Sequence, residues 1–128
     1  MADAEFSGKT VVVTGAGDAL GMGIARRFGQ AGASVVVTHA DGDTATHTAE
    51  ALRAENVSAS SATLDVTDPA QSTALVEKLV RERGRIDVWV NAARSAQPGP
   101  AETLPPAAWD EALRCTLSGA FYLSLIHI

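Results

Sequence analysis

The chain has 128 residues, 46% hydrophobic and 20% charged, which is the length and composition of one globular domain. Lys and Arg total 10 against 15 Asp and Glu, and the resulting net charge of −5 has the wrong sign for a nucleic-acid binder that relies on phosphate contacts. One cysteine and three histidines exclude a disulfide framework and a Cys/His metal quartet, so we expect no metal site.

The amino-terminal segment is acidic, whereas a secretory signal would begin with basic residues and continue with apolar ones. No apolar run approaches the roughly 20 residues that a membrane-spanning helix needs. Cys115 has no second cysteine with which to form an internal disulfide. These features predict a protein of the reducing cytoplasm, with neither a membrane nor a nucleic acid as its partner.

The first strand and the first helix differ in their apolar periodicity. Residues 10–14 are an uninterrupted β-branched run, which predicts a strand buried on both faces of a parallel sheet. Gly32 marks the carboxyl end of the first helix. The apolar face of this helix is expected to comprise Leu20, Ile24, Phe28 and Ala31.

Two further strands follow, with a helix of modest signal between them. Residues 33–38 predict a second strand, and residues 41–43 predict a turn. The helix after this turn should pack through Ala49 and Leu52. A third strand is expected near residues 59–64.

The third helix has the clearest start of all. Asp68 is a capping residue, Pro69 suits the first helical position, and Gly84 marks the end of the helix. Its apolar stripe is expected to comprise Leu75, Val76, Leu79 and Val80.

The alternation of strands and helices continues toward the carboxyl end. A fourth strand is expected over residues 86–91, followed by a Pro- and Gly-rich loop from Gln97 to Pro106 and a long helix from about Ala107. Alternating elements of these lengths imply right-handed crossovers and a parallel sheet with helices on both faces. The predicted fold class is α/β, a doubly wound sheet of about four strands. The long helix carries Trp109, Leu113, Leu117 and Phe121.

A glycine-rich segment, residues 14–21, joins the first strand to the first helix. At this junction a dinucleotide pyrophosphate can meet backbone N–H groups and the positive end of a helix dipole. The glycines miss the G-x-G-x-x-G spacing by one residue. They resemble the Thr-Gly-x-x-x-Gly-x-Gly loop of the short-chain dehydrogenase/reductase family, with Gly15 and Gly21 on the first and third glycines and Ala19 replacing the second. A rival register places Gly21 and Gly23 on the last two glycines.

The resemblance continues at fixed intervals along the chain. Asp65-Val66 resembles the family's acidic position after the third strand, which contacts the adenine ring. Residues 91–94 resemble its Asn-Asn-Ala-Gly segment, with the second Asn and the Gly both changed, and Thr116 stands where the family has an Asn of its proton relay.

The family resemblance implies a Rossmann-like fold, NAD or NADP as cofactor, and hydride transfer between the nicotinamide and a carbonyl or alcohol carbon of a small-molecule substrate. It also implies a homo-oligomer. The cofactor-binding residues that it implies are Gly15, Gly17, Asp18, Ala19, Leu20, Gly21, His39, Asp65, Val66, Asn91, Ala92 and Ala93.

Several of these positions have two interpretations. His39 ends the second strand, where a carboxylate would hold the ribose hydroxyls or an Arg would accept a 2′-phosphate, so it is either a ribose contact or a surface side chain. The choice between NAD and NADP stays open. Asp65 contacts the adenine or caps the turn before Asp68, and Asn91 ties the strand end to neighbouring backbone. Arg94 reaches a phosphate or points into solvent.

The family's catalytic Tyr, the Lys four residues after it and the Ser that holds the substrate oxygen have no counterparts here. The single Tyr122 is followed four residues later by Ile126, and the two lysines are Lys9 and Lys78. We therefore assign no catalytic residue. Residues 1–128 are expected to form one dinucleotide-binding domain, truncated at its carboxyl end, inactive alone, and unstable or self-associating.

Two other functions compete with this interpretation. One is a nucleotide-binding module without catalysis. The other is a methyltransferase-like sheet that binds S-adenosylmethionine, which is less favoured because His39 stands where such a sheet has an acidic residue.

Overall fold

A computed structural model describes residues 4–95 and 98–126 of the chain. The described residues form a four-stranded, wholly parallel sheet with the strand order β3-β2-β1-β4. The predicted α/β class and parallel sheet are confirmed. In chain order the elements are β1 (Thr10–Val13), α1 (Ala19–Gln30), β2 (Ser34–His39), α2 (Gly42–Ala54), β3 (Ala59–Thr63), α3 (Pro69–Arg83), β4 (Val88–Val90), the 3₁₀ turn η1 (Ala101–Thr103), α4 (Pro106–Leu113), the π-helical segment η2 (Arg114–Ser118) and α5 (Gly119–Ile126).

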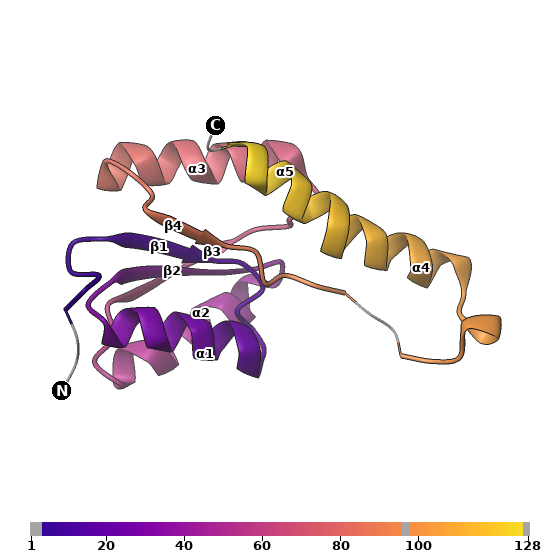
Figure 1. Cartoon of the computed structure of the whole chain (residues 1–128), viewed down its shortest axis with the longest axis horizontal. Coiled ribbons are helices and arrows are strands. Elements are labelled where there is room, and N and C mark those ends of the chain that lie inside the picture. Colours follow the sequence, from indigo (N-terminus) through magenta and orange to yellow (C-terminus); the bar gives the residue numbers. More distant parts are fainter. Residues whose placement is uncertain (1–3, 96–97, 127–128) are drawn as a thin grey trace.

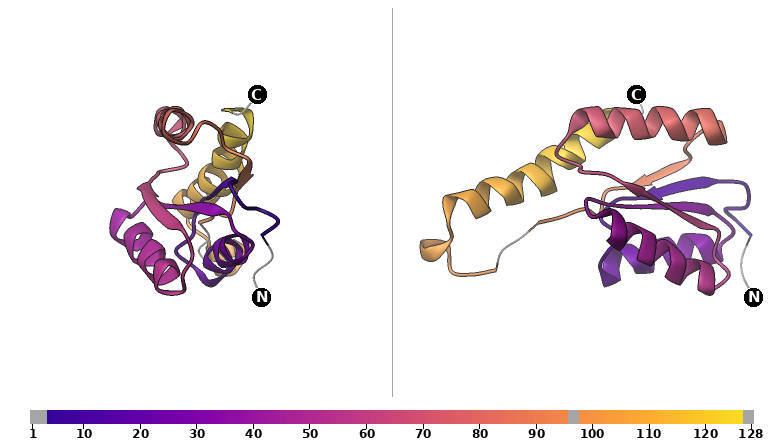
Figure 2. Two further views of the ribbon diagram at one scale, coloured as in Figure 1. Left: turned by 90° about the vertical axis from the view of Figure 1, so that its left-hand side faces the viewer. Right: turned by 180° about the vertical axis from the view of Figure 1, so that it is seen from behind.

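The helices lie on both faces of the sheet, as a doubly wound fold requires. Helices α1 and α2 cover one face, while α3 and α5 lie side by side on the other (Figure 1). The helical run from α4 to α5 begins well away from the sheet and approaches it toward α5, which the reverse view also shows (Figure 2).

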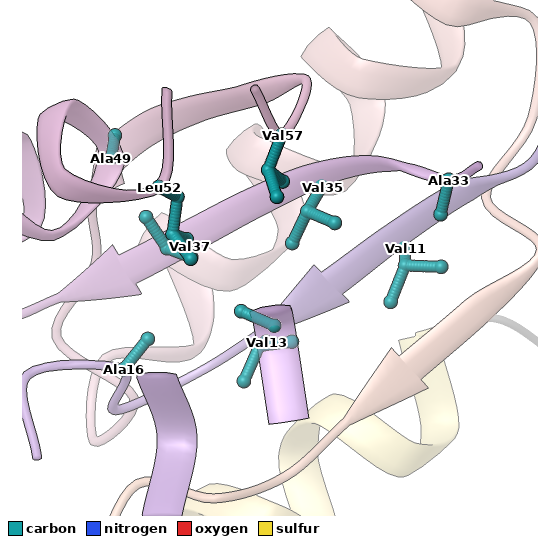
Figure 3. Close-up of a cluster of buried hydrophobic side chains, with 10 residues drawn as sticks. Val11, Val13, Ala16, Ala33, Val35, Val37, Ala49, Leu52 and Val57 are labelled. Carbon is teal, nitrogen blue, oxygen red and sulfur yellow. The ribbon is translucent and has the colours of Figure 1, made fainter. Parts of the chain in front are cut away.

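The core has two layers, because successive residues of a strand point to opposite faces of the sheet. Val11 and Val13 belong to the cluster under α1 and α2, whereas Val12 belongs to the cluster under α3 and α5. Both layers need apolar side chains, which explains why residues 10–13 do not alternate with polar ones. The first cluster, drawn in Figure 3, includes Val11, Val13, Ala16, Ala33, Val35, Val37, Ala49, Leu52 and Val57.

Two predicted helix faces need correction at one residue each. Leu20 is 59% exposed, because the contact position in the first turn of α1 belongs to Gly21, one residue and about 100° further around the helix. Val80 is 43% exposed and lies at the margin of a stripe whose other three members are buried.

Several predicted boundaries also shift. Residues 41–43 do not form a separate turn: Asp41 caps α2, its carboxylate accepting hydrogen bonds from the Asp43 backbone N–H and the Thr44 hydroxyl. The fourth strand, β4, covers only Val88–Val90 of the predicted residues 86–91, and the long helix begins at Pro106. Gln97, at the start of the predicted loop, lies outside the described residues.

Candidate functional site

The four parallel strands end at the same edge of the sheet, and four loops therefore meet there. The sheet is built outward from β1 in both directions, toward β2 and β3 on one side and toward β4 on the other. The loops after β1 and β4 consequently diverge over opposite faces. This divergence creates the crevice in which doubly wound sheets bind ligands.

Thr14 joins the loops after β1 and β4. Its fully buried hydroxyl accepts hydrogen bonds from the backbone N–H groups of Ala92 (3.2 Å) and Ala93 (3.3 Å) and lies 3.4 Å from the Val90 carbonyl, to which it donates. Sequence reasoning did not single out Thr14. The available signal was its position directly before Gly15 in the glycine-rich segment.

The glycines of this segment are required by close backbone contacts. Gly15 has φ +64°, and a Cβ on it would lie 2.3 Å from the Cα of Ala93. A Cβ on Gly21 would lie 2.7 Å from the Cα of Ala16, whereas a Cβ on Gly23 would meet nothing within 4 Å. Gly21 rather than Gly23 therefore holds α1 against the loop. This geometry favours the register in which Gly21 is the third glycine.

A cavity of about 350 Å³ lies between these loops and the helical run that follows β4. Six predicted cofactor-binding residues line it, namely Gly15, Gly17, Asp18, His39, Val66 and Ala93. The other six are not among its lining residues: Ala19, Leu20, Gly21, Asp65, Asn91 and Ala92. The cavity is also lined by residues outside the predicted set: Ala40, Leu64, Arg94, Ser95, Glu111 and Cys115.

Asp18 and Arg94 form an ion pair at this cavity. Asp18 is the N-cap of α1, and its Oδ1 accepts the Gly21 N–H at 2.9 Å. Its Oδ2 lies 3.3 Å from Nη2 and 3.4 Å from Nε of Arg94. The pKa of Asp18 is lowered by the Gly21 hydrogen bond first and by Arg94 second. Arg94 therefore does not simply point into solvent.

His39 lines the cavity beside the glycine-rich loop. A Cβ on Gly17 would lie 2.8 Å from Cδ2 of His39 and 2.7 Å from Cγ2 of Thr44, so a side chain at this position would require one or both of these neighbours to shift. The Nδ1 atom of His39 accepts the Asp41 N–H at 2.9 Å. The ribose contact of His39 stays a prediction.

Asp65 makes the turn contact that was one of its two interpretations. Its Oδ1 accepts hydrogen bonds from the hydroxyl (2.6 Å) and the backbone N–H (2.9 Å) of Thr67, and both lower the pKa of Asp65. The flanking Leu64 and Val66 line the cavity as an apolar wall. The adenine contact of Asp65 is untested.

Asn91 ties the end of β4 to side chains, not to neighbouring backbone as expected. Its Oδ1 accepts a hydrogen bond from Nε1 of Trp89 at 3.0 Å, and its Nδ2 donates to the Ser124 hydroxyl at 3.3 Å. Asn91 thus connects the sheet to α5.

The helical run from α4 to α5 forms the remaining wall. Gly119 allows this wall to approach closely, since a Cβ there would lie 2.8 Å from Cγ2 of Val66. Cys115, in the π-helical segment, is partly buried, and its pKa is raised by burial first and by the charges of Glu111 and Asp65 next. Sequence patterns could not identify Glu111 or Cys115, because only the packing of the helices brings them to the cavity.

The parts of this site match the parts of an adenine dinucleotide. The apolar wall of Leu64 and Val66 suits a base, and the glycine backbone at the start of α1 suits a pyrophosphate. Within residues 4–95 and 98–126, no three His, Cys, Asp or Glu side chains are grouped to hold a metal ion. In the same ranges no helix is long and apolar enough to cross a bilayer.

Comparison with known proteins agrees with this geometry. The model of the short chain dehydrogenase family matches residues 9–127. D-threitol dehydrogenase of Mycolicibacterium smegmatis is 33% identical over 121 residues, which are 94% of this chain and 46% of that protein. The chain spans about half the length of the curated relatives it matches.

Two solved structures illustrate the likeness in three dimensions. A citronellol catabolism dehydrogenase of Pseudomonas aeruginosa has a TM-score of 0.87 and 27% identity, over 97% of this chain and 51% of that one. A gluconate 5-dehydrogenase of Burkholderia cenocepacia, solved in complex with NADP and tartrate, has a TM-score of 0.85 and 28% identity, over 98% of this chain and 49% of that one.

Proposed function

Because the chain belongs to the short chain dehydrogenase family, we propose that it is the cofactor-binding part of an NAD- or NADP-dependent oxidoreductase. The observation that carries the proposal is the cavity between the glycine-rich loop and the loop after β4. The NADP reported for the gluconate 5-dehydrogenase supports a nicotinamide cofactor. When bound, the nicotinamide exchanges a hydride with a carbonyl or alcohol carbon of a small-molecule substrate.

The residues of this chain bind and orient the cofactor. Gly15 and Gly17 allow the backbone to approach the pyrophosphate, and Leu64 and Val66 form an apolar wall for the adenine. Thr14 holds the two loops together, so the crevice exists before a ligand arrives. Such preorganisation reduces the ordering that binding would otherwise require. The predicted contacts of Ala19, Leu20, Gly21, Asn91 and Ala92 with the cofactor belong to this proposal.

We further propose that the 128-residue chain has no dehydrogenase activity by itself. A tyrosine acts as a base near neutral pH only when a neighbouring group lowers its pKa from about 10. No lysine follows Tyr122 at the required spacing.

Calorimetric titration of the purified chain tests the proposal directly. We expect saturable binding of NADH or NADPH and no binding of S-adenosylmethionine. In a separate activity assay, we expect no turnover with sugar-alcohol or steroid-alcohol substrates. Binding of S-adenosylmethionine alone would contradict the cofactor assignment. Robust NAD(P)H-dependent turnover would contradict the proposed inactivity while leaving the cofactor site in place.

A nucleotide-binding module without catalysis is the second candidate. It is favoured by Thr116, which stands in the position of the family's relay Asn and whose hydroxyl accepts the Ser95 N–H at 3.3 Å. Reading the coding DNA past the codon for Ile128 separates the two candidates. A Tyr-x-x-x-Lys segment there supports the enzyme, and continuous coding sequence without one supports the module.

We also propose a homo-oligomer in a reducing, cytoplasmic location. The single Cys115 supports the location, since it has no partner in the sequence for an internal disulfide. The oligomer is supported by an apolar stripe on the helical run from α4 to α5. The stripe consists of Trp109, Leu113, Leu117 and Phe121, all exposed.

A further inference from the structure

The charges around the cavity are unfavourable for a phosphate, apart from one side chain. Asp18 and Glu111 contribute carboxylates to the lining. Among the described residues that line the cavity, Arg94 alone carries a permanent positive charge. Glu111 is paired with Arg114 at 2.5 Å. A dinucleotide pyrophosphate entering this cavity would therefore depend on Arg94 to offset the charge of Asp18.

The backbone around Arg94 is held in place on both sides. The Ala93 N–H donates to the Thr14 hydroxyl, and the Ser95 N–H and carbonyl both contact the Thr116 hydroxyl, at 3.3 and 3.5 Å. From this position the guanidinium reaches across the crevice to Asp18 at the start of α1. Arg94 thus comes from one loop of the site and is directed toward the glycine-rich loop on the other side.

The contact between Arg94 and Asp18 can be exchanged for another. The Arg94 side chain is 61% exposed and that of Asp18 is 38% exposed, so water screens their attraction. The two N···O distances of 3.3 and 3.4 Å exceed the 2.7–2.9 Å typical of strong charge-assisted hydrogen bonds. Asp18 does not depend on Arg94 for its capping role, since Oδ1 binds the Gly21 N–H.

We propose that Arg94 is a phosphate-binding residue whose guanidinium leaves the Asp18 carboxylate and binds the pyrophosphate of a dinucleotide. This inference rests on the proposed function and adds a residue to its site. A planar guanidinium can donate two parallel N–H groups to one phosphate, and the start of α1 supplies backbone N–H groups beside it. Asp18 keeps its cap on α1 during the exchange.

Titration of the 128-residue chain with NADH and with adenosine, which has no phosphate, tests this assignment. We expect Arg94→Ala to weaken NADH binding by roughly tenfold or more, which is the range for a lost hydrogen bond to a charged group. Adenosine affinity should stay within twofold of the original chain. Arg94→Lys keeps the charge without the planar pair of donors. Its NADH affinity should fall between that of the original chain and that of Arg94→Ala.

Asp18→Asn provides the complementary variant. The amide oxygen can still accept the Gly21 N–H, but the charge that holds Arg94 is gone, so NADH binding should become several-fold tighter. Arg81→Ala is the matched control, because it removes the same charge from the last turn of α3, at the opposite edge of the sheet. It should leave NADH affinity unchanged, and circular dichroism should confirm that every variant is folded.

The assignment fails if Arg94→Ala binds NADH as tightly as the original chain or more tightly. It also fails if the variant loses NADH and adenosine binding to the same extent, which would indicate a purely structural role. If the unsubstituted chain binds neither NADH nor adenosine, the proposed function itself is contradicted, and this inference with it.

Discussion

Gly21 and Gly23 stand two residues apart in α1, yet an added methyl group would meet different surroundings at each. At Gly21 the Cβ would overlap the backbone of Gly15 and Ala16 at 2.7 Å, and at Gly23 it would enter open space. We expect Gly21→Ala to lower the free energy of unfolding by about 1–3 kcal/mol through overpacking. Gly23→Ala should raise it by up to about 1 kcal/mol, because alanine favours the helix.

Urea denaturation of the two variants measures both effects, and each variant is the control for the other. Titration with NADH should show weaker binding for Gly21→Ala, since the glycine-rich loop must move. Equal stabilities of the two variants would show that Gly21 does not hold the helix against the loop.

Single residues show where sequence reasoning reached its limit. The positions of Gly15 and His39 could be predicted, because a motif and a strand end mark them. The partners of Asp65 and Arg94 could not be predicted. Thr67, two residues from Asp65, competes with a ligand for the Asp65 carboxylate, and Asp18 lies 76 residues from Arg94 in the sequence. A sequence pattern identifies a polar group but does not say which of several partners it will contact.

The elements β1 and β4 are joined by backbone hydrogen bonds and, in addition, by the Thr14 hydroxyl. This hydroxyl accepts hydrogen bonds from two N–H groups of the loop after β4. Thr14→Val replaces this hydroxyl with a methyl group of similar size and leaves both N–H groups without their acceptor. Unsatisfied buried N–H groups cost about 1–3 kcal/mol each, and we expect a total loss of about 2 kcal/mol because these two are only partly buried and their bonds are long.

Thr14→Ser retains the hydroxyl and serves as the control, with an expected loss below about 1 kcal/mol. Urea denaturation gives the stability, and hydrogen exchange at the amides of Ala92 and Ala93 localises the change. Unchanged exchange at these amides in Thr14→Val would contradict the tie between the two loops.

Most elements could be predicted because their signals are local. Asp68 caps α3 through the Ala70 N–H, and Gly84 ends the helix with φ +85°, as expected from these two residue types. The π-helical segment at residues 114–118 has no such marker. Its effect is positional, since it brings Cys115 to the cavity and lets Gly119 pack on Val66.

At the scale of the whole molecule, four of the six large hydrophobic side chains that are exposed among the described residues lie on the helical run from α4 to α5. The side chains of Leu117 and Phe121 are 66% and 60% exposed. Contiguous apolar surface of this kind marks contacts with other proteins, and we propose a second copy of the chain as the partner. The double variant Leu117→Gln, Phe121→Gln should therefore shift the protein toward the monomer.

Sedimentation velocity over a range of concentrations measures this shift. Leu20→Gln is the control, because Leu20 is also largely exposed but lies on α1, away from the apolar stripe. Identical distributions for the original chain and the double variant would rule out this stripe as the contact between copies.

The sequence by itself determined the α/β class, the order of the elements and the glycine-rich junction between β1 and α1. These features depend on hydrophobic periodicity and on residues with special backbone preferences, which act over a few positions. The strand order β3-β2-β1-β4 and the cavity that draws on all four loops were decided by the tertiary structure. The tertiary structure also decided the ion pair of Asp18 with Arg94 and the hydrogen bond between Thr14 and Ala92. These contacts join residues distant in the chain, and only packing around a shared core brings them within hydrogen-bonding distance.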